Sequence, residues 1–114
     1  MFTVVIATRN RVADLAHSLD RLCSLPDQPD VVVDNGSSDD TVPMVRQRYP
    51  RARLEALGRN EGAGARNHGV AAAGTPYVAF ADDDSWWAPG ALAIAGRLFE
   101  ACPRLALIAT WSEA

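Results

Sequence analysis

Tyr77-Val-Ala-Phe-Ala-Asp-Asp-Asp-Ser-Trp-Trp87 is an apolar run that ends in three consecutive carboxylates. The run from Tyr77 to Ala81 predicts a strand covered on both faces of a parallel sheet. Asp82, Asp83 and Asp84 follow it, and two such charges ~4 Å apart repel by about 4 kcal/mol at an effective dielectric of about 20. A divalent cation is the simplest group to offset this cost, because Mg²⁺ and Mn²⁺ bind one or two carboxylates together with substrate phosphates. We therefore expect a metal site at this strand end, holding a phosphorylated ligand.

The same stretch has a second interpretation as the start of a helix. Ser85 or Asp84 is of the type that caps a helix, and Pro89 suits the first helical turn. Acidic triplets occur in both settings, so this stretch alone leaves both interpretations open.

The composition is that of a small soluble protein. The 114 residues predict a single domain (residues 1–114) with a modest core, and 48% of them are hydrophobic. The net charge is −3, so no nucleic-acid partner is expected. No apolar run is long enough to cross a membrane, and Met1 leads into a strand pattern rather than a signal peptide. These features predict a cytoplasmic protein without a transmembrane segment.

Strand and helix patterns alternate along the whole chain. The expected strands cover residues 2–7, 30–34, 52–57, 77–81 and 105–110. Helical patterns lie between them, at about 12–22, at about 40–49, in a small-residue segment ending near 73, and at 89–102, where Leu92, Ala95, Leu98 and Phe99 are expected to face inward. This alternation predicts an α/β fold, a mostly parallel sheet with helices on both faces. Because the chain stops just after the fifth strand pattern, we expect it to be the front part of a larger fold.

Polar side chains gather where the expected strands end. They are Thr8, Arg9 and Asn10 after the first strand, Asp34 and Asn35 after the second, Arg59 and Asn60 after the third, and the Asp triplet after the fourth. Each cluster alone is equally typical of a turn or a cap. Because ligands of open parallel sheets bind beyond the carboxyl ends of the strands, the clusters together predict a ligand crevice.

Common phosphate-binding motifs do not explain this edge. Gly62-Ala-Gly64 precedes a helix, but it follows the third strand, and Asn67 replaces the last glycine of a dinucleotide fingerprint. The Gly-Lys-Ser/Thr of a P-loop is absent from the sequence. Arg66 follows the glycines, and its planar guanidinium suits a diphosphate, although an isolated helix arginine exposed to solvent is the simpler alternative.

Four segments, in this order, resemble glycosyltransferase family 2, whose members have the GT-A fold. They are Thr3-Val-Val-Ile-Ala-Thr-Arg-Asn-Arg11, Val31-Val-Val-Asp-Asn-Gly-Ser-Ser-Asp-Asp-Thr41, Asn60-Glu-Gly-Ala-Gly-Ala-Arg-Asn-His-Gly69, and Tyr77 to Leu92 with the family's Asp-x-Asp motif as Asp82-Asp83-Asp84. The resemblance covers essentially the whole chain. It implies a Rossmann-like domain that is the nucleotide-sugar-binding half of the GT-A fold.

The resemblance also implies roles for individual residues. Thr8 and the loop after it, with Arg9, would line the nucleotide base, and Asp34 would bind the base or the ribose. Arg66 would contact the base or the diphosphate. The ribose contact would come from Asp82 or Asp83. Asp84, with Asp82, would bind Mn²⁺ or Mg²⁺.

The implied function is the transfer of a sugar, with inversion, from a metal-bound UDP-, GDP- or dTDP-sugar to an acceptor hydroxyl. The metal and Arg66 would stabilise the departing nucleoside diphosphate. In the family, the carboxylate that deprotonates the acceptor comes from a later part of the fold. We therefore expect the catalytic base beyond Ala114, since no motif supports Glu113 in that role.

Two other functions stay open on the sequence alone. A non-catalytic nucleotide- or nucleotide-sugar-binding module would use the same crevice. A hydrolase of the haloacid-dehalogenase type also carries an Asp-x-Asp after an apolar strand, but on its opening strand and followed by threonine or valine, whereas Ser85-Trp86 follow here. The sequence leaves open the donor base and sugar, the acceptor and the oligomeric state.

Overall fold

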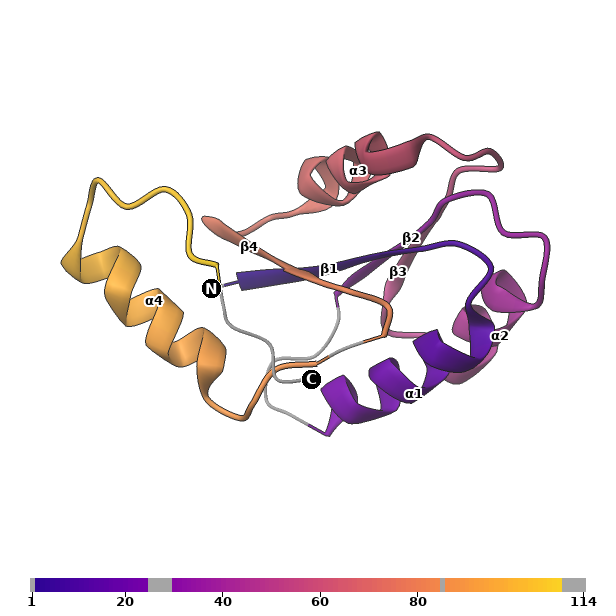
Figure 1. Cartoon of the computed structure of the whole chain (residues 1–114), viewed down its shortest axis with the longest axis horizontal. Helices are drawn as coiled ribbons and strands as arrows, with labels where there is room; N and C mark the ends of the chain where they lie inside the picture. The colour runs from indigo at the N-terminus through magenta and orange to yellow at the C-terminus, as the bar shows by residue number, and fades with distance from the viewer. Residues whose placement is uncertain (1, 25–29, 85, 110–114) are drawn as a thin grey trace.

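The computed structural model describes residues 2–24, 30–84 and 86–109, and these form an open α/β sheet with helices on both faces (Figure 1). Its parallel strands lie in the order β3-β2-β1-β4. The strands are β1 (Phe2–Thr8), β2 (Val31–Asp34), β3 (Arg53–Ala56) and β4 (Tyr77–Ala81). The helices are α1 (Val12–Cys23), α2 (Thr41–Arg48), α3 (Ala65–Ala72), preceded by the 3₁₀ turn η1 (Gly62–Gly64), and α4 (Ala91–Ala101). The predicted fold class is confirmed.

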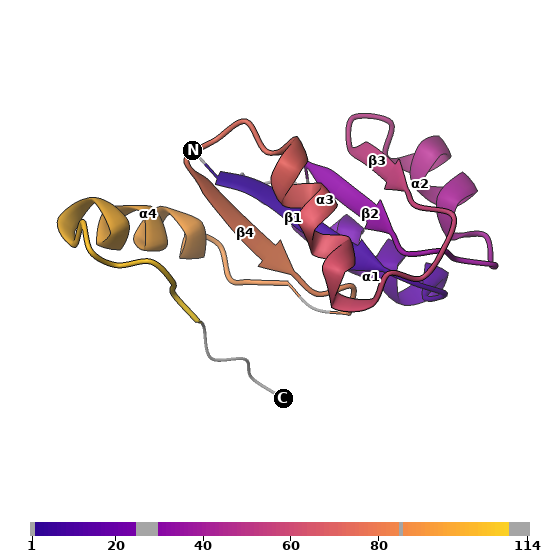
Figure 2. The ribbon, with the colours of Figure 1, turned by 90° about the horizontal axis from the view of Figure 1, so that it is seen from above.

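The central strands β1 and β2 are mostly apolar because helices cover both of their faces. Val4 and Ile6 of β1 belong to one buried cluster, together with Leu15 and Leu19 of α1. The alternate residue Val5 points to the opposite face and belongs to a second cluster with Ala65 and others. Figures 1 and 2 show the result, with α3 on one face of the sheet and α1 and α2 on the other. The helical spacing of Leu15, Leu19 and Leu22 is what buries α1.

The strand register brings the loops after the strands to one edge of the sheet. Thr8, the last residue of β1, is in register with Asp34 of β2, and Asp34 is in register with Ala56 of β3. On the other side, Ala81 of β4 is in register with Ile6. The loop that carries the Asp triplet therefore begins beside the end of β1, as expected for carboxyl ends of parallel strands.

The prediction that β4 is covered on both faces is wrong. Phe80 is 50% exposed, and only Ala81 in this strand is buried. The reason is the strand order, because β4 lies at the edge of the sheet described here and has β1 as its neighbour. An apolar run reports the character of the side chains and does not reveal whether a strand is central or at an edge.

Two expectations about the C-terminal segment are also wrong. Residues 105–109 form no strand, and Thr110, the last residue of the expected fifth strand, lies outside the described residues. In α4, Leu92 is buried and Phe99 stacks on Tyr77 with ring centroids 4.6 Å apart, but Leu98 is 45% exposed. The helix contacts the sheet through a narrower stripe than the spacing of its apolar residues predicts, because it packs at the edge strand.

The helix-cap interpretation of the Asp triplet is not supported by Asp84. α4 begins at Ala91, with Gly90 as its N-cap residue at φ 84° and no side-chain cap hydrogen bond. Pro89 precedes the helix rather than lying in its first turn, and Ser85 lies outside the described residues. Asp84 therefore does not cap α4.

In the part of the chain that the structure describes, no helix has the length and hydropathy needed to cross a bilayer.

Candidate functional site

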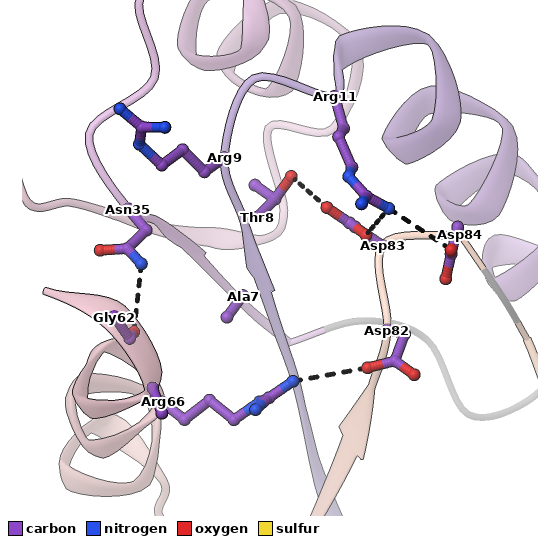
Figure 3. Close-up of a pocket in the computed structure, with 11 residues that line it drawn as sticks. Ala7, Thr8, Arg9, Arg11, Asn35, Gly62, Arg66, Asp82, Asp83 and Asp84 are labelled. Atoms are coloured by element: carbon purple, nitrogen blue, oxygen red, sulfur yellow. Dashed lines mark hydrogen bonds and ion pairs between the residues drawn. The ribbon is translucent and has the colours of Figure 1, made fainter. Parts of the chain in front are cut away.

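A cleft of about 610 Å³ lies at the carboxyl edge of the sheet (Figure 3). Its size falls within the range of about 300–1,000 Å³ that is usual for small-molecule sites. The end of β1, the loops after β1, β2 and β4, the turn η1 and the start of α3 supply its lining, which consists of Ala7, Thr8, Arg9, Arg11, Asn35, Gly62, Ala63, Arg66, Asp82, Asp83 and Asp84. Three aspartates and three arginines are among these residues, so their formal charges cancel. Such a cleft suits a ligand with both anionic and hydrogen-bonding groups.

Asp83 is the anchored member of the triplet. Its carboxylate accepts a hydrogen bond from the Thr8 hydroxyl at 3.0 Å, and its backbone carbonyl accepts one from the buried Ser18 hydroxyl of α1 at 3.1 Å. The Asp83 side chain is only 14% exposed. Burial raises the pKa of this carboxyl, and the Thr8 hydrogen bond and the Arg11 charge offset part of the rise.

Asp82 and Asp84 are the exposed members, with 67% and 56% of their side chains accessible. Two arginines approach the triplet from opposite sides of the cleft, as Figure 3 shows. Arg11 lies 3.5 Å from Asp83 and 3.4 Å from Asp84, and Arg66 lies 3.4 Å from Asp82. In this structure, guanidinium groups thus offset the carboxylate repulsion for which the sequence suggested a metal.

Asn10 holds the loop after β1 against the loop after β2. Its backbone is in the left-handed region at φ 52°, which asparagine tolerates better than most residues. In this conformation its side-chain oxygen accepts hydrogen bonds from the N–H groups of Ser38 (2.7 Å) and Asp39 (3.3 Å), and its own N–H donates to the Ser37 hydroxyl (2.9 Å). The backbone that carries Arg9 and Arg11 is fixed by these bonds.

Asn35 and Gly36 make the corresponding link to the loop after β3. The Asn35 side chain accepts from the N–H of Glu61 (2.6 Å) and donates to the carbonyl of Gly62 (3.1 Å). Gly36 has φ 79°, and an added Cβ would lie 2.5 Å from the backbone carbon of Arg59. Only glycine permits this close approach. The glycine segment before α3 is thereby placed at the cleft.

The structure brings most of the predicted site residues together. Thr8, Arg9, Arg66 and the three aspartates all line the cleft. Asp34 does not line it, since this residue is 2% exposed and one carboxylate oxygen accepts from the Ser37 N–H at 3.1 Å. Its other oxygen, Oδ1, is buried and has no hydrogen-bond partner among the described residues. A role for Asp34 in base or ribose binding stays a prediction.

Two polar lining residues, Arg11 and Asn35, were not among the predicted site residues, although Asn35 stands in one of the polar clusters at the strand ends. Arg11 is next in sequence to the predicted loop, and its charge alone could have marked it. In contrast, Arg59 lies outside the cleft, with its side chain 81% exposed and 3.8 Å from Glu61.

The tryptophans after the triplet have different surroundings. Trp87 packs against the buried cluster beneath the sheet. Trp86 is 44% exposed and contacts α1, with its ring 5.2 Å from the His17 ring and 5.4 Å from the Arg21 guanidinium carbon. Neither residue lines the cleft.

The carboxylates fit a divalent metal only when a ligand completes the coordination. Among the described residues, no three side chains of His, Cys, Asp or Glu are grouped as a ready-made metal site. Asp82 and Asp84 nevertheless present accessible oxygen ligands at the cleft. Mg²⁺ and Mn²⁺ are commonly held by one or two carboxylates together with substrate phosphates, so this donor set is sufficient for such an ion.

An open parallel sheet with a charged cleft at its carboxyl edge defines an α/β ligand-binding domain. The particular family follows from comparison with known sequences, because the family described as Glycosyl transferase family 2 matches residues 3–111. The chain belongs to this family.

Individual relatives agree with this assignment. The succinoglycan biosynthesis protein ExoU of Rhizobium meliloti (strain 1021) is 30% identical over 94 residues, which cover 78% of this chain and 28% of that protein. A mannosyltransferase, PcManGT from Pyrobaculum calidifontis, in complex with GDP-Man and Mn²⁺, superposes with a TM-score of 0.72 at 28% identity, over 86% of this chain and 32% of that one.

A second solved structure, S. aureus TarS 1-349, shares the fold. Its TM-score is 0.73 at 24% identity, over 88% of this chain and 32% of that chain. The expected GT-A-type, Rossmann-like fold is confirmed. The chain spans about a third of the length of the relatives it matches.

Proposed function

We propose that this protein is a nucleotide-sugar-dependent glycosyltransferase and that residues 1–114 hold its donor site. The observation that carries the proposal is the cleft itself, where Asp82 and Asp84 are exposed beside Arg11 and Arg66 at the carboxyl edge of the sheet. The relative from P. calidifontis, which is in complex with GDP-Man and Mn²⁺, supports a nucleoside diphosphate sugar and a divalent ion as ligands.

The three aspartates would have different tasks. Asp83 is engaged by Thr8 and Ser18, so it fixes the loop rather than binding the ligand through both of its oxygens. Asp84 and Asp82 are exposed, so they would hold Mn²⁺ or Mg²⁺ together with the diphosphate. Asp82, rather than Asp83, is then the better candidate for the ribose contact. Bound there, the ion would act as a Lewis acid toward the leaving diphosphate.

The arginines would bind the anionic part of the donor. Arg66 extends from the first turns of α3 into the cleft, and its planar fork can bind two phosphate oxygens. Arg9 lines the same cleft and would contact the base or ribose. The Thr8 hydroxyl donates to Asp83 and Thr8 is 3% exposed, so its contribution would be to position Asp83.

Inversion at the sugar carbon and an acceptor hydroxyl remain parts of the proposal that rest on the family resemblance. We propose that the base for the acceptor comes from outside residues 1–114. A cytoplasmic location likewise stays a prediction of the sequence.

The alternative, a non-catalytic nucleotide-sugar-binding module, would use the same cleft and would differ only in showing no transfer or hydrolysis of the bound sugar.

Calorimetric titration with UDP, GDP and dTDP, each with and without Mn²⁺, tests the donor site. We expect one of the nucleotides to bind in a Mn²⁺-dependent manner, and we expect Asp84→Ala to weaken this binding at least about tenfold, the size of one lost charge-assisted contact. Glu100→Ala removes an exposed carboxylate from α4, away from the cleft, and should bind like wild type. Failure of all three nucleotides to bind to the folded chain in the presence of Mn²⁺ would overturn the proposal.

A further inference from the structure

The Arg11 side chain occupies the carboxylate loop in a way that bears on metal binding. Its Nη1 atom lies between two carboxylates, 3.5 Å from Asp83 Oδ1 and 3.4 Å from Asp84 Oδ2 (Figure 3). A divalent ion on Asp84 Oδ2 would take the place of this guanidinium, and an ion on the other oxygen of the carboxylate would lie close to it. Two cations cannot share the Asp84 carboxylate at close range without repulsion.

The contact between the Arg11 side chain and Asp84 can be broken without a change in the backbone. The Arg11 backbone is fixed, since its carbonyl accepts the first hydrogen bond of α1 from the Leu15 N–H at 2.8 Å. The side chain, in contrast, is 52% exposed, and the Asp84 side chain is 56% exposed. The Arg11–Asp84 ion pair is exposed and therefore weak, so the guanidinium can leave Asp84 with little loss of stability. The side chain alone has to move.

The cleft also offers Arg11 a second partner. Arg11 and Arg66 line the cleft together, on either side of the triplet. A diphosphate bound between them would present oxygens that suit a guanidinium, while the metal took over the carboxylate. The movement of one side chain would thus exchange the carboxylate partners Asp83 and Asp84 for a phosphate partner.

We propose that Arg11 is the resident cation of the carboxylate loop, which competes with the divalent metal for Asp84 and passes to the diphosphate when donor and metal bind together. The proposal rests on the proposed donor site. Arg11 would then couple the two ligands, because it lowers metal affinity when the nucleotide is absent and contributes to nucleotide affinity when the metal is present. It is a positioning residue of the binding equilibrium rather than a group that reacts.

Mn²⁺ binding in the absence of nucleotide tests this inference, measured by the loss of the electron paramagnetic resonance signal of free aqueous Mn²⁺. The matched control for Arg11→Gln is Arg9→Gln, which removes the same charge from the same cleft, where Arg9 has no ion pair with a carboxylate of the described residues. We expect Arg11→Gln to bind Mn²⁺ about two- to fivefold more tightly than Arg9→Gln, the factor that corresponds to one exposed ion pair. Arg11→Lys keeps the charge and should stay close to wild type.

The second arm repeats the titration with saturating GDP, UDP or dTDP. We expect the nucleotide that binds wild type to raise its Mn²⁺ affinity by a larger factor than it raises that of Arg11→Gln. Equal or weaker Mn²⁺ binding by Arg11→Gln than by Arg9→Gln in the first arm would overturn the inference, and so would the absence of Mn²⁺ binding by both variants. If no nucleotide binds to wild type, the proposed function fails, while the first arm still decides whether Arg11 competes with the metal.

Discussion

Neighbouring residues of one type have unequal environments in this chain, as the Asp triplet shows. Asp83 is 14% exposed and is held by Thr8 and Ser18, whereas Asp82 and Asp84 are open to the cleft. The difference follows from the partners, because Thr8 and Ser18 engage Asp83 alone. Three consecutive aspartates thus differ in accessibility: Asp83 is held in place, whereas the side chains of Asp82 and Asp84 are exposed at the cleft.

Asp39 shows a second structural use of a carboxylate near the site. It accepts hydrogen bonds from the N–H groups of Thr41 (3.0 Å) and Val12 (3.3 Å) and also from the Thr41 hydroxyl. The Thr41 hydroxyl bond, together with the backbone bonds, holds the pKa of Asp39 below its ordinary value. A carboxyl with a lower pKa in the folded state stabilises the fold above its unfolded pKa, and this contribution is lost as the pH falls through the folded value.

We predict that Asp39→Asn lowers the free energy of unfolding at neutral pH and that the difference from wild type shrinks as the pH falls below about 4, the ordinary range for aspartate. Urea unfolding at a series of pH values measures this. Asp40→Asn is the control, because Asp40 is the N-cap residue of α2 but makes no side-chain cap hydrogen bond. A difference for Asp39→Asn that persisted unchanged in acid would contradict the explanation.

Much of the site could be predicted from residue types alone. Polar residues after four strand patterns indicated the edge at which the cleft lies, and the Asp triplet, Thr8, Arg9 and Arg66 all line it. What the sequence did not reveal is which charges meet. Arg11 and Arg66 reach the triplet from segments far away in the chain, and such pairings depend on tertiary structure rather than on local pattern.

At the scale of elements, the close approach of α3 to the sheet depends on one glycine. Gly69 is buried, and an added Cβ would lie 2.3 Å from Val5 Cγ1 on the central strand β1. α3 also carries Arg66 into the cleft, so the packing of the helix determines the position of a site residue.

We predict that Gly69→Ala destabilises the protein by about 1–3 kcal/mol, because overpacking outweighs the higher helix propensity of alanine. Thermal or urea unfolding gives the value. Gly74→Ala is the matched control, since no atom lies within 4 Å of its added Cβ, and it should change stability by less than about 1 kcal/mol. Equal effects of the two substitutions would show that the contact with Val5 relaxes freely.

Helix α4 separates buried from exposed leucines more sharply than its sequence suggests. Leu92 is 8% exposed and joins the core cluster, whereas Leu98 is 45% exposed. We predict that Leu92→Ala costs about 2–4 kcal/mol and Leu98→Ala less than about 1 kcal/mol, measured by urea unfolding. A comparable loss from both would mean that the outer face of α4 is covered in solution.

The C-terminal part of the chain, from β4 onward, is where the sequence-based prediction of the fold fails. Apolar runs and alternation located all four described strands, and helical periodicity located the helices between them, because burial imposes these patterns. It could not show that β4 is an edge strand or that residues 105–109 do not pair, since pairing partners are set by the whole sheet. The expected inward position of Leu98 failed for the same reason.

On the scale of the whole molecule, the parallel sheet converts residues from distant segments into one site. The lining residues meet at the cleft because each ends a strand of the same sheet, follows one, or lies in the first turns of the helix after it; they are residues 7–9, 11, 35, 62, 63, 66 and 82–84. At the amino ends of the strands, Phe2 contacts Tyr77 with ring centroids 5.3 Å apart, and Phe2 also packs against Phe99 of α4. The cleft and this aromatic contact with α4 thus lie at opposite ends of the strands.

The most direct test of the donor site is amide chemical-shift mapping of the ¹⁵N-labelled chain with UDP, GDP and dTDP in the presence of Mg²⁺. The account predicts that the nucleotide that binds shifts the amides of Arg9, Asn35, Ala63 and Arg66 at the cleft, while those of Arg46 and Arg48 in α2 stay unchanged. Shifts centred on another surface, or none with any of the three nucleotides, would contradict the assignment of the cleft as a nucleotide-sugar site.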